Sequence, residues 1–187
     1  NEWHLRILAG EETADTARAK RYMAFLESFG VETKRIELEQ VYERYRQAYT
    51  THRRAVPGAA ALVAALQQRG VKLAVLTNHH SLADQTAKLT ECGLPHLADV
   101  LNVLAAIGYT KPDPRAFHMV VDSLGVSAHQ TVMVGDSLRS DVEGALGAGL
   151  RAVWLNRRGE PRPAGLQAAV LSAFEPINQA VSTILDN

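Results

Sequence analysis

Two carboxylates follow the apolar run at 131–134, in the stretch VGDSLRSD at 134–141. Asp136 and Asp141 lie five residues apart, directly after a predicted strand. Carboxylate oxygens suit Mg²⁺, which usually binds one or two carboxylates and completes its shell with water and substrate phosphate. Taken alone, the two residues fit a turn residue and a helix cap equally well. Their meaning therefore depends on which groups lie beside them.

Further polar residues follow two other predicted strands. Thr77 and Asn78 come after the apolar run at 71–76, and Lys111 lies between turn residues in TKPDP at 110–114. Each alone is compatible with an ordinary turn or a surface cation. Open parallel sheets, however, bind ligands beyond the carboxyl ends of their strands. A hydroxyl, an amide and an ammonium group around a carboxylate pair can neutralise and orient phosphoryl oxygens, so the combination predicts a phosphoryl-transfer site.

The elements that must position these residues alternate along the chain. Apolar runs and capping signals predict strands at 71–76, 100–104, 131–134 and 151–155, and helices at 59–69, 81–91, 113–125 and 141–146. The tail from Pro163 is expected to hold one or two helices. Strands separated by helices predict parallel βαβ units, hence an α/β fold with helices on both faces of the sheet.

The N-terminal part shows a helical pattern without predicted strands. Apolar residues at helical spacing predict one helix over 11–30 and a second carrying Tyr42, Tyr45 and Tyr49. We expect these tyrosines to pack between the two helices rather than to stack on a ligand. The change at 54–58 predicts a helical domain at 1–54 and an α/β domain at 55–187.

Composition narrows the classes of function. The 187 residues carry 20 basic and 20 acidic side chains, with no long block of one sign, which argues against nucleic acid as a partner. Cys92 is the only cysteine, so an internal disulfide and a thiolate metal cluster are excluded. The longest apolar run, 59–66, is too short to span a membrane. We expect a soluble, cytoplasmic protein with no membrane partner; its oligomeric state stays open.

The ordered set of motifs resembles the haloacid dehalogenase (HAD) superfamily of hydrolases. Its second motif is similar to LAVLTN at 73–78, its third to TKPDP, and its fourth to VMVGDSLRSD at 132–141; the resemblance spans 56–158 and continues through DVEGALGAGLRAVWLNR. It implies a Rossmann-like parallel sheet with flanking helices. The N-terminal helices resemble a fragment of the helical cap in the capped phosphatases and nucleotidases.

The resemblance also implies roles for the site residues. The protein would be a Mg²⁺-dependent phosphatase that acts on a small phosphorylated metabolite through an aspartyl-phosphate. Asp136 would bind Mg²⁺ directly, and Asp141 would bind it more weakly or fix the loop. Lys111 would balance the charge of nucleophile and phosphate, while Thr77 and Asn78 would hold the transferring group.

One motif of the family is missing. The nucleophile belongs to an Asp-x-Asp sequence, and none occurs in the chain. In the family its strand lies between the strands that end at Thr77 and Gly135, so its loss would leave two unpaired interior edges. We interpret His4–Leu8, the only upstream candidate strand, as part of a cap helix. We therefore expect the natural protein to have a longer N-terminus that supplies the motif.

Other functions remain open. A 2-haloacid dehalogenase would not need the metal that Asp136 and Asp141 suggest, and a non-catalytic relic or interaction module would keep only the scaffold. A phospho-receiver domain is disfavoured because its phosphorylated Asp precedes the Thr and Lys in sequence. His79 and His80 make a poor chelate because adjacent side chains point in different directions; a contact of one of them with substrate or cap stays open.

Overall fold

The structure is a computed structural model that describes residues 14–32, 35–79, 81–95, 97, 100–103 and 108–186. The interpretations of His4–Leu8 and of His80 fall outside these residues. The chain divides into two compact units, 1–53 and 54–187. Each unit is described by itself.

The first unit contains two helices, α2 (Ala14–Glu27) and α3 (Arg35–Thr51). The rings of Tyr22 and Tyr45 lie 5.1 Å apart, so the predicted packing between the helices is confirmed at Tyr45. Tyr49 is 53% exposed and lies beneath the Arg53 guanidinium, 5.4 Å from the ring centre. The side chain of Tyr42 is outside the described residues.

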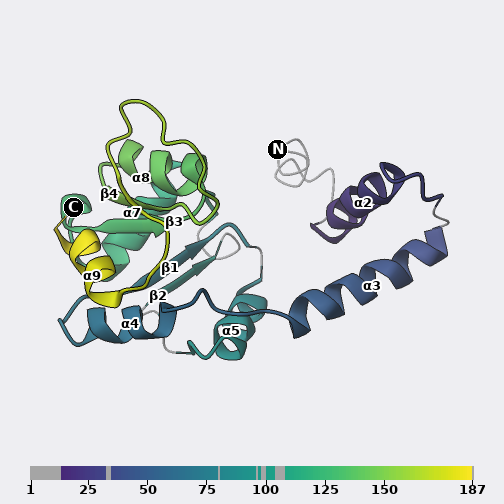
Figure 1. Ribbon diagram of the computed structural model, residues 1–187, viewed down its shortest axis with the longest axis horizontal. Coiled ribbons are helices and arrows are strands. Elements are labelled where there is room, and N and C mark those ends of the chain that lie inside the picture. Colours follow the sequence, from purple (N-terminus) through teal and green to yellow (C-terminus); the bar gives the residue numbers. More distant parts are fainter. Residues whose placement is uncertain are drawn as a thin grey trace. The chain divides into compact units, whose positions relative to one another are not determined.

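The second unit is built on parallel strands (Figure 1). Strands β3 (Val132–Gly135), β4 (Arg151–Leu155) and β5 (Ala169–Leu171) form one sheet in that order, and β1 (Ala74–Thr77) pairs with β2 (Val100–Val103) in another. Val134 is in register with Val153, and Thr77 with Val103. The predicted α/β class with a parallel sheet and flanking helices is thus confirmed.

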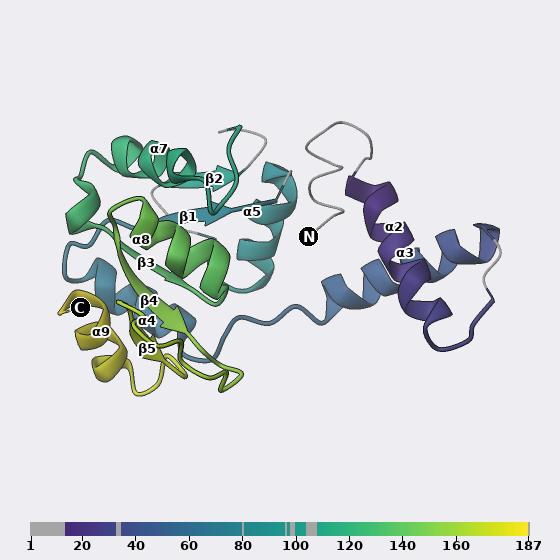
Figure 2. The same cartoon turned by 90° about the horizontal axis from the view of Figure 1, so that it is seen from above.

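Strand β4 is buried on both faces, as a central parallel strand should be. Ala152 and Trp154 contact one core cluster, with α7 (Pro114–Leu124) and α8 (Gly144–Gly147). Val153 and Leu155 contact the other, with α4 (Ala59–Gln67) and α9 (Ile177–Leu185). Figure 2 shows the strands between these two helical layers. The alternation of side chains along β4 therefore joins both layers.

The two sheets share these cores. Leu76 of β1 packs against the cluster around Trp154, and Leu73 against the cluster around Val153. Figures 1 and 2 both show β1 beside β3. Nevertheless β1 pairs only with β2, and β3 only with β4, among the strands that the structure describes. By resemblance, the Asp-x-Asp strand would lie beside the edges of β1 and β3 that have no partner among the described strands.

Most predicted elements are confirmed at their positions. Helix α5 (Leu82–Glu91) begins at Ser81, whose hydroxyl accepts a hydrogen bond from the Asp84 N–H, and Asp113 caps α7. The strand predicted at 71–76 is shifted toward the C-terminus, at Ala74–Thr77.

Two predictions need correction. The expected helix at 141–146 is a π-helical segment, Leu138–Glu143, followed by α8, because Asp141 is held by the preceding loop. The tail contains the strand β5 as well as the helix α9. β5 escaped prediction because its three residues are too few to show a periodic pattern.

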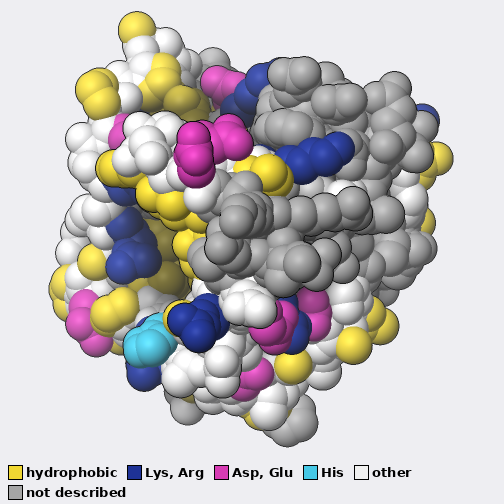
Figure 3. Space-filling model, turned by 90° about the vertical axis from the view of Figure 1, so that its right-hand side faces the viewer, with side chains coloured by type: hydrophobic (Ala, Val, Ile, Leu, Met, Phe, Trp, Pro, Cys, Tyr) yellow, Lys and Arg dark blue, Asp and Glu magenta, His cyan; other side chains and the backbone are white. Residues whose placement is uncertain are grey.

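No helix in the described ranges combines the length and apolarity needed to cross a membrane. On the face drawn in Figure 3, the coloured acidic and basic side chains are interspersed, as the balanced charge of the sequence predicts.

Candidate active site

Lys111 joins the two sheets at their carboxyl edge. Its ammonium group donates hydrogen bonds to the Leu76 carbonyl (2.8 Å) and to Asp141 Oδ1 (2.7 Å). Leu76 lies near the end of β1, and Asp141 lies in the segment after β3. The two side chains are only 11% and 7% exposed, so the ion pair is shielded from bulk water. Residues from two of the three predicted positions are thus held together across the gap between β1 and β3.

Asp141 is fixed by the loop that carries it. Its Oδ2 accepts a hydrogen bond from the Ser137 N–H at 3.0 Å, while Oδ1 binds Lys111. A Cβ at Gly135 would overlap the Asp141 side chain, so only glycine permits this close approach. The segment begins where the Ser137 hydroxyl accepts from the Ser140 N–H. One oxygen of Asp141 therefore holds its own loop, and the other holds the Lys111 ammonium group.

Asn78 is bound to the backbone of Lys111. The Asn78 amide donates to the Lys111 carbonyl at 2.9 Å, and its Oδ1 accepts from the Lys111 N–H at 2.8 Å. This two-bond contact fixes the Lys111 loop against the end of β1. Thr77, the last residue of β1, is half-buried, and its hydroxyl has no hydrogen-bond partner within the described ranges. Of the predicted pair, Thr77 therefore has the unengaged side chain.

The loop after Lys111 is held by a charged clamp. The Asp113 carboxylate accepts from the Arg115 guanidinium (2.6 Å to Nη2), and the Arg115 guanidinium lies 4.2 Å from the ring centre of Tyr109. The hydrogen bond from the Arg115 side chain, reinforced by the Arg115 backbone N–H, lowers the pKa of Asp113 to about 2. Asp113 thus stays charged as the cap of α7 at any ordinary pH.

Asp136 differs from Asp141 in its surroundings. Its side chain is exposed, and its carboxylate makes no hydrogen bond or ion pair with any described residue. Its main-chain carbonyl accepts from the indole N–H of Trp154 at 3.2 Å, which fixes the backbone at this turn. Trp154 itself is 1% exposed. The main chain of the turn is therefore anchored to Trp154, whereas the carboxylate is available to a ligand.

The carboxylates of this edge can supply some, but not all, of the ligands of a Mg²⁺ ion. No group of three His, Cys, Asp or Glu side chains suited to a metal occurs among the described residues. Mg²⁺ is commonly held by one or two carboxylates together with water and phosphate oxygens, and Asp136 can supply one such carboxylate. The Asp141 carboxylate, the second candidate, is engaged by Lys111 and the Ser137 N–H.

Several residues of this edge were not predicted from the sequence. Gly135 and Ser137 shape the Asp141 loop, and Asn156, Arg157 and Arg158 line a pocket with Asp136. The signal for the last three was present, because they directly follow the predicted strand at 151–155. The same rule that singled out Thr77 and Asp136 would have found them.

Comparison with known proteins identifies the family. A family model for haloacid dehalogenase-like hydrolases matches residues 3–149. The chain is a HAD-like hydrolase by family. Among curated relatives, the phosphoserine phosphatase of Thermus thermophilus is 38% identical over 135 residues, which cover 72% of this chain and 52% of that protein. The pyrimidine 5'-nucleotidase YjjG of Escherichia coli is 32% identical over 112 residues, covering 59% of this chain and 49% of that protein. This HAD-like chain spans about half the length of the curated relatives it matches.

Solved structures agree with the fold. The HAD-hydrolase YfnB of Bacillus subtilis, determined with bound magnesium, matches with a TM-score of 0.75 and 26% identity, over 97% of this chain and 78% of that one. The L-2-haloacid dehalogenase RSc1362 gives the same TM-score at 20% identity, over 97% and 80% of the two chains. The second likeness concerns the fold alone. The HAD-like architecture is therefore common to relatives with different chemistries.

Proposed function

We propose that the protein is a Mg²⁺-dependent phosphatase acting on small phosphomonoesters, in which an Asp-x-Asp strand lies between β1 and β3. The observation that carries this proposal is the contact of the Lys111 ammonium group with Leu76 and Asp141 across that gap. It brings a fixed positive charge to the edge where Thr77 ends β1. Phosphatases among the relatives, named for phosphoserine and N-acylneuraminate 9-phosphate, support the substrate class.

Each residue has a defined part in the proposed reaction. Thr77 donates its hydroxyl hydrogen to a phosphoryl oxygen, and Lys111 places its positive charge beside the phosphate and the attacking carboxylate. Asn78 holds the Lys111 loop in place, and Asp141 anchors the ammonium group. Asp136 is the residue of this chain that would hold Mg²⁺, which supplies charge neutralisation on the phosphoryl oxygens. The nucleophile would be the first Asp of the Asp-x-Asp strand.

Magnesium dependence tests the proposal. Hydrolysis of p-nitrophenyl phosphate by the natural full-length protein should require Mg²⁺, and Asp136→Asn should raise the Mg²⁺ concentration for half-maximal rate by about 10- to 100-fold. Asp122→Asn is the matched control, since Asp122 is exposed on α7. Activity without metal, or an Asp136→Asn variant with unchanged Mg²⁺ response, would contradict the proposal.

Two further measurements separate the alternatives. Halide release from 2-chloropropionate without Mg²⁺ would indicate a dehalogenase, and turnover by the 187-residue chain alone would show that the Asp-x-Asp strand is unnecessary. The upstream reading frame provides an independent check. If it encodes no Asp-x-Asp, the proposed route through an aspartyl-phosphate fails.

A further inference from the structure

A pocket of about 630 Å³ opens beside Asp136, beyond the carboxyl ends of β3 and β4. Its lining includes Ser137, the buried Trp154 and residues of the loop after β4. This volume lies within the range of about 300–1,000 Å³ typical of small-molecule sites. The pocket therefore offers room for the part of a substrate that lies beyond its phosphoryl group.

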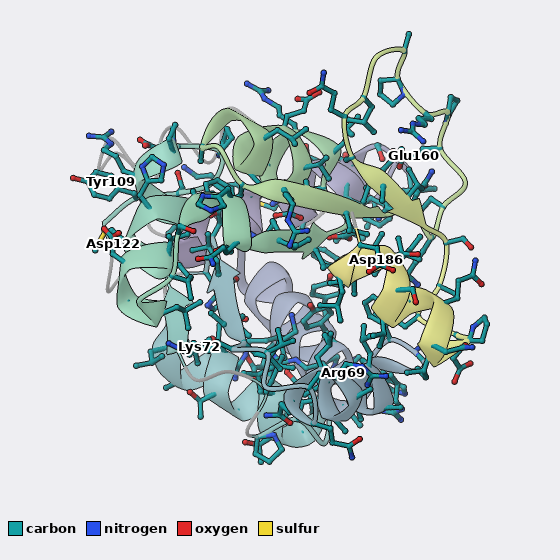
Figure 4. The ribbon with its side chains drawn as sticks, turned by 90° about the vertical axis from the view of Figure 1, so that its left-hand side faces the viewer. Arg69, Lys72, Tyr109, Asp122, Glu160 and Asp186 are labelled. Atoms are coloured by element: carbon teal, nitrogen blue, oxygen red, sulfur yellow. The ribbon has the colours of Figure 1, made fainter. Side chains whose placement is uncertain are left out.

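The loop after β4 is closed on itself. The Asn156 amide donates to the Glu160 carbonyl at 2.8 Å, and its Oδ1 accepts from the Glu160 N–H at 2.9 Å. The Asn156 N–H also donates to the Leu171 carbonyl of β5 at 2.7 Å. Figure 4 shows Glu160 on this loop, well separated from Arg69. Two of the three residues enclosed by the loop, Arg157 and Arg158, are thus carried on a fixed backbone.

Arg157 and Arg158 give the pocket its positive charge. Arg157 is exposed, and its guanidinium makes no hydrogen bond or ion pair with the described part of the chain. Arg158 lies 4.0 Å from the Glu160 carboxylate, with 83% and 51% of the two side chains exposed. Such an exposed pair is weak. Both guanidinium groups are therefore available to an anion. The Glu160 carboxylate would compete with that anion for Arg158.

We propose that this pocket binds a second anionic group, a carboxylate or a second phosphate, on the alcohol portion of the substrate. The inference rests on the proposed function, which places the phosphoryl group at Asp136 and Lys111. Guanidinium groups bind carboxylate and phosphate through paired, charge-assisted hydrogen bonds. Arg157 and Arg158 are accordingly residues that determine specificity, selecting phosphomonoesters with an acidic leaving group.

Binding to matched ligands tests this inference. Trp154 lines the pocket, and because Trp3 is the only other tryptophan, fluorescence of a Trp3→Phe protein reports on Trp154. With Mg²⁺ present, the phosphate ester of 3-hydroxypropionate should bind about tenfold or more tightly than propyl phosphate. Propane-1,3-diol bisphosphate in a parallel titration distinguishes a second phosphate from a carboxylate as the preferred group.

Variants locate the effect. Arg157→Ala/Arg158→Ala should abolish the preference for the acidic ligands, whereas Arg69→Ala, a change of an exposed arginine on another element, should preserve it. Glu160→Gln should strengthen binding of both acidic ligands by removing the competing carboxylate. An equal response to acidic and neutral ligands, a preference that survives the double arginine change, or no response to any ligand would overturn the inference.

The outcome is separable from that of the proposed function. Turnover of p-nitrophenyl phosphate without any preference for acidic ligands would reject the anion pocket alone. A preference lost in the double arginine variant, in a full-length protein that hydrolyses no phosphate ester, would uphold the pocket and reject the phosphatase.

Discussion

At the scale of single residues, the site depends on contacts between side chains that are far apart in sequence. Lys111 and Asp141 are separated by 30 positions, and Asn78 and Lys111 by 33. The sequence placed all of them after strands, so their gathering at one edge could be predicted. Their partners could not, because a motif does not tell which oxygen an ammonium group will approach. The bonds of Asn78 to the Lys111 backbone are therefore known only from the structure.

The Lys111–Asp141 pair should contribute substantially to stability. Lys111→Met leaves the Asp141 carboxylate uncompensated and nearly buried, so we expect the free energy of unfolding to fall by about 3 kcal/mol. In a double-mutant cycle with Asp141→Asn, measured by urea denaturation, the two changes should be less than additive, with a coupling of about 1 kcal/mol or more. The exposed pair Arg46–Glu43 is the control, for which a much smaller coupling is expected. Full additivity at Lys111 and Asp141 would count against their interaction.

Asp113 should keep its contacts in the loop after Lys111 down to a low pH. The pKa of Asp113 is lowered from its ordinary value of 3.8 to about 2, mainly by the side-chain hydrogen bond from Arg115. Because the pKa is depressed, the stabilisation that the charged Asp113 gives to the folded state is complete above about pH 4. This stabilisation is lost as the pH falls through about 2. An NMR titration should show this low pKa, and Arg115→Ala should return it toward 3.8. An unchanged pKa in that variant would exclude Arg115 as the cause.

At the scale of elements, strongly patterned segments were predictable and short or distorted ones were not. The strand at 151–155 and the helix after Asp113 were placed correctly because burial and capping mark them in the sequence. The segment at 138–143 was predicted in part as α-helix. Its geometry is instead set by the hydrogen bonds that Asp141 accepts from Ser137 and Lys111. A tertiary contact of this kind leaves no periodic signal.

Gly135 should tolerate no side chain. A Cβ at this position would overlap Asp141, so Gly135→Ala must displace the carboxylate that holds Lys111, at a cost of about 1–3 kcal/mol in the free energy of unfolding. Gly147, at the end of α8, has open space around it, so Gly147→Ala should be neutral or slightly stabilising. Thermal unfolding of both variants makes the comparison. Equal melting temperatures would show that the Asp141 loop yields easily.

At the scale of the whole molecule, the α/β unit has a continuous pair of cores but an interrupted sheet. Family membership and fold class followed from the order of the motifs. Unpaired backbone groups at an interior edge are costly and are open to pairing with other chains. β1 and β3, each with one partner strand among those described, are therefore expected to open more readily than β4.

Hydrogen exchange should reveal this weakness. The amides of β4, which has a partner strand on each side, should exchange at least about tenfold more slowly than those of β1, which pairs only with β2 among the described strands. Strand β5, an outer strand paired only with β4 in the same set, is the reference for an ordinary edge. Protection of β1 equal to that of β4 would mean that its second edge is covered in solution.

Under the proposed function, the nucleophile lies on a strand between β1 and β3, which would make it a separable part of the protein. A peptide of one strand's length could add to both edges in parallel, much as donated strands complete other sheets. The Lys111 ammonium group already connects the end of β1 to the loop after β3. Such a peptide would therefore bind between two strands whose ends are held together. Catalysis could then be divided between two molecules and switched by mixing them, as in a split reporter enzyme.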